Sequence, residues 1–237
     1  FNEHLCGRLQ NADVAVKNVN IAGLTIKEKQ KIIRDFTNEV AIMMDLRSPR
    51  IVIIYGVITT EADSLRLVME YCPGGDLRVF LDSGEPIDDR RKLGVAYEIA
   101  AGMEYLYSRG AEHRDLKAKN CLLDEHGHIK LTDFGLAKNA DLVTHTASKT
   151  SGGISGTVPH MAPEVLDDDD DDTFGFTEKS DMYSFAMTMF ELLTCDYPWR
   201  NKTPAQIMRL VCDKAKRPTY TQRTPVELVD IMTRGWA

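Results

Sequence analysis

The chain has 237 residues, of which 43% are hydrophobic and 27% are charged, and its formal net charge is −7. This length suits one large domain or two lobes that share a cleft, and the apolar fraction excludes global disorder. The negative charge, much of it in the aspartate tract of residues 167–172, argues against nucleic acid and anionic lipid as primary partners.

The first 72 residues read as a small sheet with one helix. Residues 14–19 alternate as a strand does, and residues 27–46 carry apolar side chains at spacings of three and four, which predicts a helix. Residues 51–58 and 64–69 are predicted as further strands, and the first of these is far shorter than the roughly 20 residues of a membrane span. Turn-forming residues 71–76 then mark the expected boundary between two lobes, 1–72 and 73–237.

The second part of the chain is mainly helical by its pattern. Residues 91–108 predict a helix, and residues 182–193 are apolar nearly all round, which predicts a buried central helix. Residues 121–124 and 129–131 flank a turn and predict a short hairpin. Two peripheral helices are expected at 203–211 and 225–234. The five cysteines are scattered without a C-x-x-C pair, as expected of reduced thiols in a cytoplasmic protein.

Four short segments carry residues that folding alone does not require. Lys17 is a cation within an apolar strand, where taken alone it would be an edge-strand lysine reaching for water. Glu39 falls on the apolar face of the predicted helix and needs a buried partner, for which Lys17 is the obvious candidate. Residues 113–120 place Asp115, which can accept a hydroxyl proton, five residues before the metal-binding oxygen of Asn120. Asp133 follows the hairpin and offers a hard oxygen ligand for magnesium.

The ordered set of motifs resembles the eukaryotic protein kinase catalytic domain over essentially the whole chain. The matching segments are V-A-V-K ending at Lys17, Glu39, H-R-D-L-K-A-K-N at 113–120, D-F-G at 133–135, and A-P-E at 162–164. The resemblance implies an α+β, bilobal fold with a small antiparallel-sheet lobe, residues 1–72, and a larger helical lobe, residues 73–237. It also implies an activation segment over residues 133–164, and transfer of phosphate from ATP with Mg²⁺ as cofactor.

The resemblance assigns four residues to catalysis. Lys17 is expected to contact the α- and β-phosphates of ATP and to pair with Glu39. Asp115 is expected to be the catalytic base, and Lys117 is expected to steady the γ-phosphate.

Further residues are assigned to magnesium and to adenine. Asn120 and Asp133 are expected to hold the metal ions. The expected adenine site comprises the hinge, the residue that guards the pocket behind it, and the two side chains that close on the ring: Glu70, Cys72, Met69, Ala15 and Leu122. Ordinary core packing explains Leu122 equally well.

Lys117 bears on the substrate hydroxyl. Protein-serine/threonine kinases usually carry a lysine two residues after the catalytic aspartate, and a threonine such as Thr157 that bonds to both of these residues. The expected substrates are therefore serine and threonine side chains of proteins. Residues 73–77 and 216–218 resemble the tyrosine-kinase-like group, which leaves dual specificity open.

The expected activation segment carries hydroxyl residues that an upstream kinase could phosphorylate. A phosphate on Thr150, Ser151 or Ser155 could pair with Arg114 and order the segment. The alternative is a polar loop whose hydroxyl groups serve only for solvation.

Several positions depart from the kinase pattern. The chain opens where the glycine-rich loop should end and stops before the last helix, whose arginine would pair with Glu164. We therefore expect a fragment cut at both ends, marginally stable and weak in ATP binding. Glu112 replaces the usual aliphatic residue before His113, and His160 stands where tyrosine or tryptophan is common.

Two other functions compete with a protein kinase. A pseudokinase that acts as a binding scaffold is opposed by the full set of catalytic side chains. A small-molecule phosphotransferase is disfavoured by the A-P-E segment and the long loop before it, which serve to dock a polypeptide.

Overall fold

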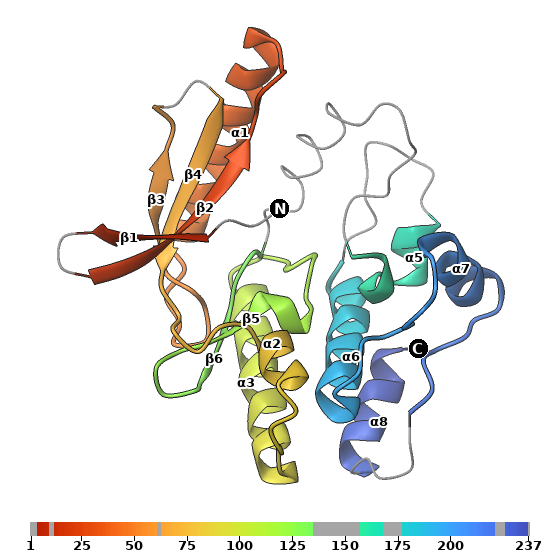
Figure 1. Cartoon of the computed structure of the whole chain (residues 1–237). Helices are drawn as coiled ribbons and strands as arrows, with labels where there is room; N and C mark the ends of the chain where they lie inside the picture. Colours follow the sequence, from red (N-terminus) through yellow and green to blue (C-terminus); the bar gives the residue numbers. More distant parts are fainter. Residues whose placement is uncertain are drawn as a thin grey trace.

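A computed structural model describes residues 4–9, 12–60, 63–134, 157–167, 177–220 and 226–236. A sheet with one helix lies at one end of the molecule, and the remaining helices lie at the other end (Figure 1). This segregation of a sheet from a helical body is the α+β arrangement that the kinase resemblance implies.

The larger sheet is antiparallel, with the strand order β1-β2-β4-β3. Its strands are β1 (His4–Leu9), β2 (Ala12–Asn20), β3 (Ile54–Ile58) and β4 (Ser64–Glu70). In β2, Ala15 pairs with Met69 and Lys17 pairs with Leu67 of β4. Because side chains alternate along a strand, Ala15 and Lys17 point to the same face of the sheet.

Helix α1 (Ile26–Met44) lies against the sheet (Figure 1). Ile32, Phe36, Val40 and Met43 recur at the spacing of one helix face, and all four are buried. The predicted helix is therefore confirmed, together with the face by which it packs.

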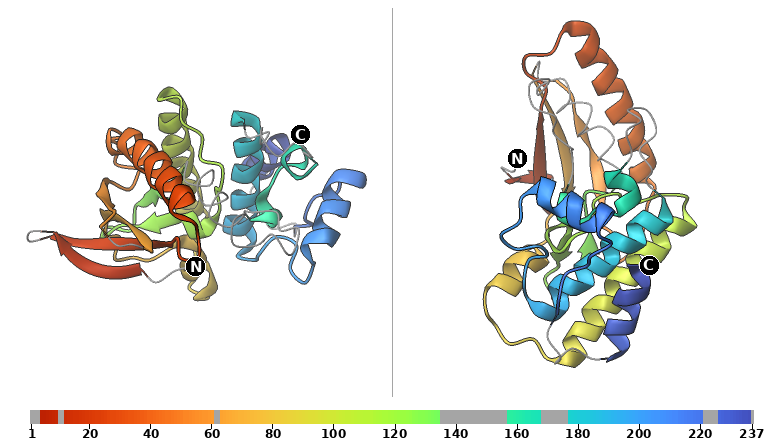
Figure 2. Two further views of the ribbon diagram at one scale, coloured as in Figure 1. Left: turned by 90° about the horizontal axis from the view of Figure 1, so that it is seen from above. Right: turned by 90° about the vertical axis from the view of Figure 1, so that its right-hand side faces the viewer.

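Among the described residues, most of the helical body consists of six α-helices. They are α2 (Leu77–Asp82), α3 (Asp89–Ser108), α5 (Pro163–Leu166), α6 (Glu178–Thr194), α7 (Pro204–Met208) and α8 (Val226–Gly235). Asp76, Asp88 and Thr177 cap α2, α3 and α6 by accepting backbone N–H groups in the first turn. Helix α6 is buried along nearly its whole length and packs beside α8 and α3, as its apolar sequence predicts (Figure 2).

Short segments complete the body. A two-stranded sheet of β5 (Cys121–Leu123) and β6 (Ile129–Leu131) confirms the predicted hairpin. The described part of the chain also has the 3-10 turns η1 (Ala118–Asn120) and η2 (Val158–His160). The helix expected over 203–211 is instead α7 followed by a π-helical turn, η3 (Arg209–Asp213).

The segment before β3 joins the two parts of the molecule. The Val52 N–H group donates to the Leu131 carbonyl at 2.9 Å, and the Leu131 N–H group donates to the Arg50 carbonyl at 2.8 Å. The strand expected to begin at residue 51 therefore begins at Ile54, because Ile51 pairs with β6 instead of β4. On the other side of β6, α3 approaches so closely that a Cβ atom on Gly102 would lie 2.7 Å from Leu131 Cδ1.

None of the helices in the described ranges combines the length and apolar character needed to cross a bilayer.

Candidate active site

A buried carboxylate from α6 holds the loop of residues 113–120 in shape. Asp181 is 1% exposed and accepts the backbone N–H groups of His113 and Arg114, each at 2.7 Å. Arg114 has a φ of 66°, which is uncommon for a non-glycine residue, and its bond to Asp181 stabilises this conformation. Burial raises the pKa of Asp181, although the charge of His113 and the two N–H groups oppose the shift. The loop is therefore anchored from within the helical body.

Asp115 presents its carboxylate between a lysine and a threonine. Oδ2 lies 2.6 Å from Lys117 Nζ, and Oδ1 accepts the Thr157 hydroxyl at 2.9 Å. Lys117 also donates to the Thr157 hydroxyl. The Asn120 amide nitrogen donates to Asp115 Oδ2 at 3.0 Å. The Asp115 side chain is 23% exposed, so the carboxylate is fixed in direction and still reachable by a substrate.

Lys17 and Asp133 meet across the gap between the sheet and the helical body. Lys17 Nζ lies 2.8 Å from Asp133 Oδ1, although the two residues come from β2 and from the segment after β6. The backbone carbonyl of Asn120 accepts the Thr132 N–H group at 3.0 Å, which brings Asp133 next to the 113–120 loop. The structure therefore gathers Lys17, Asp115, Asn120 and Asp133 at one place, and the pairing of Lys17 with Glu39 stays a prediction.

Asn120 and Asp133 are the residues at this place that fit a magnesium ion. Because the Asn120 amide nitrogen is engaged with Asp115, its amide oxygen is the atom left to face a metal. Within the described ranges, no group of three or more histidine, cysteine, aspartate or glutamate residues is arranged to hold a metal. Two oxygen donors suit Mg²⁺, which in phosphate-transfer sites takes one or two protein ligands and completes its shell with water and substrate phosphates.

A cavity of about 250 Å³, here called the smaller cavity, lies beside these residues. Its lining residues are Ala15, Met69, Tyr71, Cys72, Pro73, Gly75, Asp76, Lys119, Asn120, Leu122, Thr132 and Asp133. Ala15 comes from β2 and Leu122 comes from β5, so both parts of the molecule contribute apolar side chains to this cavity. Ala15, Met69, Cys72 and Leu122, which were predicted for the adenine site, therefore line the same cavity as Asn120 and Asp133.

Glu70, which the kinase resemblance places at the hinge, is not among the residues that line the smaller cavity. Its Oε1 lies 2.8 Å from Lys130 Nζ of β6, and its Oε2 accepts the Ile53 N–H group at 3.1 Å. Its contribution to an adenine site would thus come from the backbone. Burial and the charge of Glu70 raise the pKa of the Cys72 thiol to about 12, so this thiol stays protonated and is not a nucleophile at neutral pH.

Lys119 and Thr132 line the smaller cavity but were not predicted from the sequence, and neither was Asp76, which caps α2. Thr132 directly precedes Asp133, and its hydroxyl lies 3.9 Å from Met69 Sδ. Lys119 is exposed and contributes a positive charge at the cavity wall. Their positions beside Asp133 and Asn120 are the signal that could have identified them.

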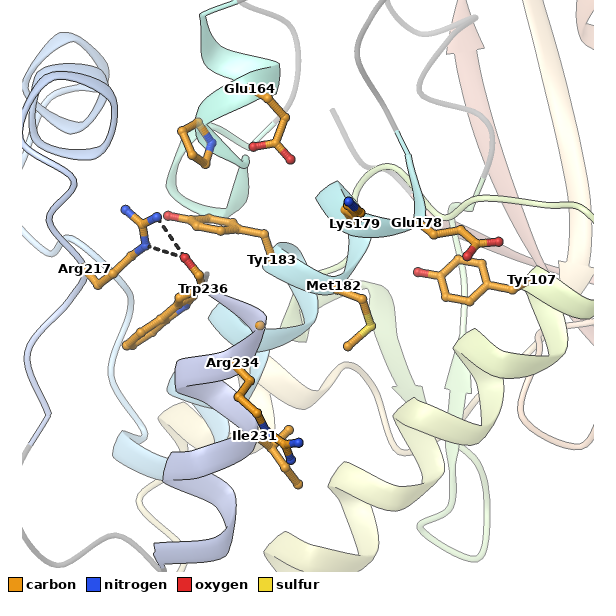
Figure 3. Close-up of a pocket in the computed structure, with 12 residues that line it drawn as sticks. Tyr107, Glu164, Glu178, Lys179, Met182, Tyr183, Arg217, Ile231, Arg234 and Trp236 are labelled. Carbon is orange, nitrogen blue, oxygen red and sulfur yellow. Dashed lines mark hydrogen bonds between the residues drawn. The ribbon is translucent and has the colours of Figure 1, made fainter.

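The larger cavity, about 830 Å³, lies elsewhere in the helical body (Figure 3). Its lining includes Glu164 of α5, Tyr183 of α6 and Trp236, which follows α8. Arg217 donates to the Trp236 carbonyl there. The larger cavity contains none of the residues assigned to catalysis or to magnesium, so its size does not make it the reaction site.

Comparison with known proteins identifies the family. The sequence profile described as protein tyrosine and serine/threonine kinase matches residues 3–237. The chain belongs to this kinase family. Protein kinases of this family generally use ATP and Mg²⁺, which agrees with the polar groups around the smaller cavity.

Named relatives of this kinase domain are serine/threonine kinases. The serine/threonine-protein kinase CTR1 of Arabidopsis thaliana is 39% identical over 209 residues, which is 86% of the chain and 24% of CTR1. The probable serine/threonine-protein kinase drkD of Dictyostelium discoideum is 36% identical over 97% of the chain and 17% of its own length. The serine/threonine/tyrosine-protein kinase HT1 of Arabidopsis thaliana is 32% identical over 94% of the chain and 55% of HT1. The kinase domain thus spans between about a sixth and about half of these three relatives.

Proposed function

We propose that this kinase domain transfers the γ-phosphate of ATP to serine and threonine hydroxyl groups of protein substrates. One observation carries the proposal: the Asp115 carboxylate is held by Lys117 and Thr157 beside Asn120 and the Lys17–Asp133 pair. A proton acceptor, two cations and two hard oxygen ligands thereby meet next to a cavity with apolar walls.

Each of these residues has its own role in the proposed phosphate transfer. Asp115 orients the acceptor hydroxyl and takes its proton, and its fixed geometry fits that role. Lys117 lies close enough to Asp115 to stabilise negative charge on the transferred group. Lys17 provides the cation for the α- and β-phosphates. When bound through Asn120 and Asp133, Mg²⁺ neutralises phosphate charge.

The choice of serine and threonine rests on the environment of Asp115. Lys117 and Thr157 contact both oxygens of the carboxylate, as expected of serine/threonine kinases. CTR1 and drkD carry that activity in their names, whereas HT1 is named for serine, threonine and tyrosine. Tyrosine phosphorylation is therefore a distinct outcome of the test below. An intracellular location fits the four free cysteines of the described residues.

Regulation by phosphorylation of the activation segment is part of this proposal. The surroundings of Arg114 in the structure change its expected strength. Thr150, Ser151 and Ser155 lie outside the described residues. Arg114, the expected partner of a phosphate, already pairs through Nε with Glu112 Oε2 at 3.1 Å. A phosphate delivered by an upstream kinase would therefore compete with Glu112 for this cation, so its effect would be weaker than in a site with an aliphatic residue at position 112.

The test is phosphate transfer by the whole protein that contains this chain. Radiolabelled ATP, Mg²⁺ and a generic basic protein acceptor would be combined with wild type, Asp115→Asn and the surface control Asp230→Asn. We expect phosphoserine and phosphothreonine from wild type and the control, and about a 100-fold or greater loss of rate for Asp115→Asn. Equal rates for all three proteins, or no transfer by wild type, would contradict the proposal.

A further inference from the structure

A second carboxylate of α6, Glu191, lies at the centre of a buried polar network near the candidate active site. Glu191 is 1% exposed, and its Oε1 lies 2.7 Å from His160 Nε2 and accepts the Ala118 N–H group at 3.1 Å. Its Oε2 accepts from Arg78 of α2 at 3.1 Å. Four segments that are distant in the sequence, α2, the 113–120 loop, η2 and α6, therefore meet at one side chain.

The surroundings of His160 select one form of its ring. His160 is 2% exposed, Nε2 faces Glu191, and Nδ1 is buried with no hydrogen-bond partner among the described residues. The ring also meets the edge of Tyr197, with centroids 5.8 Å apart. A proton on Nε2 can be donated to the Glu191 carboxylate, whereas a proton on Nδ1 would be buried without an acceptor. The geometry thus places a proton on Nε2, where Glu191 can accept it.

Glu191 is charged in this network, which strengthens its contact with His160. Burial alone would raise the pKa of Glu191, but the hydrogen bond and charge of His160, the Ala118 N–H group and Arg78 together lower it. Arg78 is in turn held by Asp82 and by the carbonyl of Cys195. A carboxylate fixed from three sides is a rigid anchor for the histidine.

Two sets of hydrogen bonds, here called tethers, consequently connect Thr157 and η2 to the 113–120 loop. The first is direct, from the Thr157 hydroxyl to Asp115 and Lys117. The second runs from His160 through Glu191 to the Ala118 N–H group, the residue directly after Lys117. The backbone N–H group of His160 donates to the Thr157 carbonyl at 2.7 Å. A displacement of His160 would therefore also displace Thr157.

We propose that His160 is a positioning residue that sets the place of Thr157 against Asp115 and Lys117 through its bond to Glu191. The proposal rests on the proposed kinase function and assigns a task to a residue that departs from the family pattern. His160 touches no reacting group, so its loss affects the rate of phosphate transfer and leaves ATP binding unchanged. The same bond also orders the segment that leads into the A-P-E motif.

The test compares two amides in the whole protein that contains this chain. His160→Gln places an N–H donor close to the position of Nε2, whereas the shorter side chain of His160→Asn places it near Nδ1 and out of reach of Glu191. The control is His128→Gln, which breaks a histidine–glutamate contact of the same 2.7 Å length, to Glu98, away from the candidate active site. Three quantities are measured: kcat with a basic protein acceptor, KM for ATP, and amide hydrogen exchange of residues 157–166.

We expect His160→Asn to lower kcat about tenfold and to speed the exchange of residues 157–166 about tenfold, with KM for ATP within about twofold of wild type. His160→Gln should keep both quantities within about threefold of wild type, as should the control. Indistinguishable behaviour of the Asn and Gln variants would overturn the proposal. If wild type transfers no phosphate, the proposed function fails, and the exchange measurement still decides whether His160 positions the segment.

Discussion

At the scale of single residues, the site depends on contacts that link distant parts of the sequence. Thr157 follows Asp115 by 42 residues, and its hydroxyl nevertheless donates to Asp115 at 2.9 Å and accepts from Lys117. Removing this hydroxyl leaves one oxygen of the Asp115 carboxylate without its fixed donor. The carboxylate can then rotate away from the direction that the proposed phosphate transfer requires.

Thr157→Val should therefore lower kcat about tenfold, because a charge-assisted hydrogen bond is lost while the shape of the side chain is kept. Thr157→Ser retains the hydroxyl and should recover most of the rate. Steady-state kinetics with a protein acceptor would measure both variants. A rate for Thr157→Val equal to that of wild type would show that Asp115 needs no such support.

Asp181 provides a second prediction at this scale, concerning stability. Its two oxygens accept the N–H groups of His113 and Arg114, whereas an asparagine offers one oxygen and one NH₂ group. Asp181→Asn should therefore cost about 1–3 kcal/mol of unfolding free energy, since one buried N–H group loses its acceptor. Urea unfolding would measure the change, with Asp230→Asn as a surface control that stays within about 0.5 kcal/mol of wild type. An unchanged midpoint for Asp181→Asn would contradict this role.

At the scale of elements, repeating patterns were predictable, whereas irregular pairings were not. The three-and-four spacing identified α1 and its buried face, and the continuous apolar run identified α6. The same reasoning placed a strand start at residue 51, because an apolar run does not reveal that Ile51 pairs with β6. Strand β1 was not predicted either, since its residues lack clear alternation of apolar and polar side chains.

Two glycines of α3 give matched substitutions with opposite expected signs. A Cβ atom on Gly102 would lie 2.7 Å from Leu131 Cδ1, whereas one on Gly94 meets nothing within 4 Å. Gly102→Ala should therefore destabilise the fold by about 1–3 kcal/mol by overpacking. Gly94→Ala should stabilise it by up to about 1 kcal/mol through helix propensity. Thermal unfolding of both variants checks the pair, and a stabilised Gly102→Ala would show that α3 does not press on β6 as described.

At the scale of the whole molecule, the motifs predicted which residues would lie in the candidate active site. They did not predict the side-chain contacts that hold the surrounding elements together. The family motifs predicted that four residues share one site, and the structure places them together: Lys17, Asp115, Asn120 and Asp133. The Arg78–Glu191 and His160–Glu191 contacts join residues 113 and 31 positions apart, and they depend on how α2, η2 and α6 pack. Such contacts follow from the tertiary fold and have no signature in a single sequence.

The network at Glu191 links the stability of the whole fold to pH. Because the folded-state pKa of Glu191 lies below the ordinary 4.5, its contribution is complete above pH 4.5 and is lost as the pH falls through the folded-state value. Glu191→Gln should cost about 3–5 kcal/mol at neutral pH, because Arg78 is left without its buried partner. Urea unfolding at a series of pH values should show this difference constant above pH 4.5 and shrinking below it. A difference independent of pH would mean that Glu191 is not charged in the folded protein.

We propose that one nucleotide binds between the sheet and the helical body, with its phosphates beside Lys17 and Asp133. A crystal structure of the domain with Mg²⁺ and a non-hydrolysable ATP analogue tests this claim most directly. We predict adenine in the smaller cavity between Ala15 and Leu122, and a metal ion on Asn120 and Asp133. An analogue bound instead in the larger cavity beside Glu164 and Trp236, or phosphates remote from Lys17, would contradict the account.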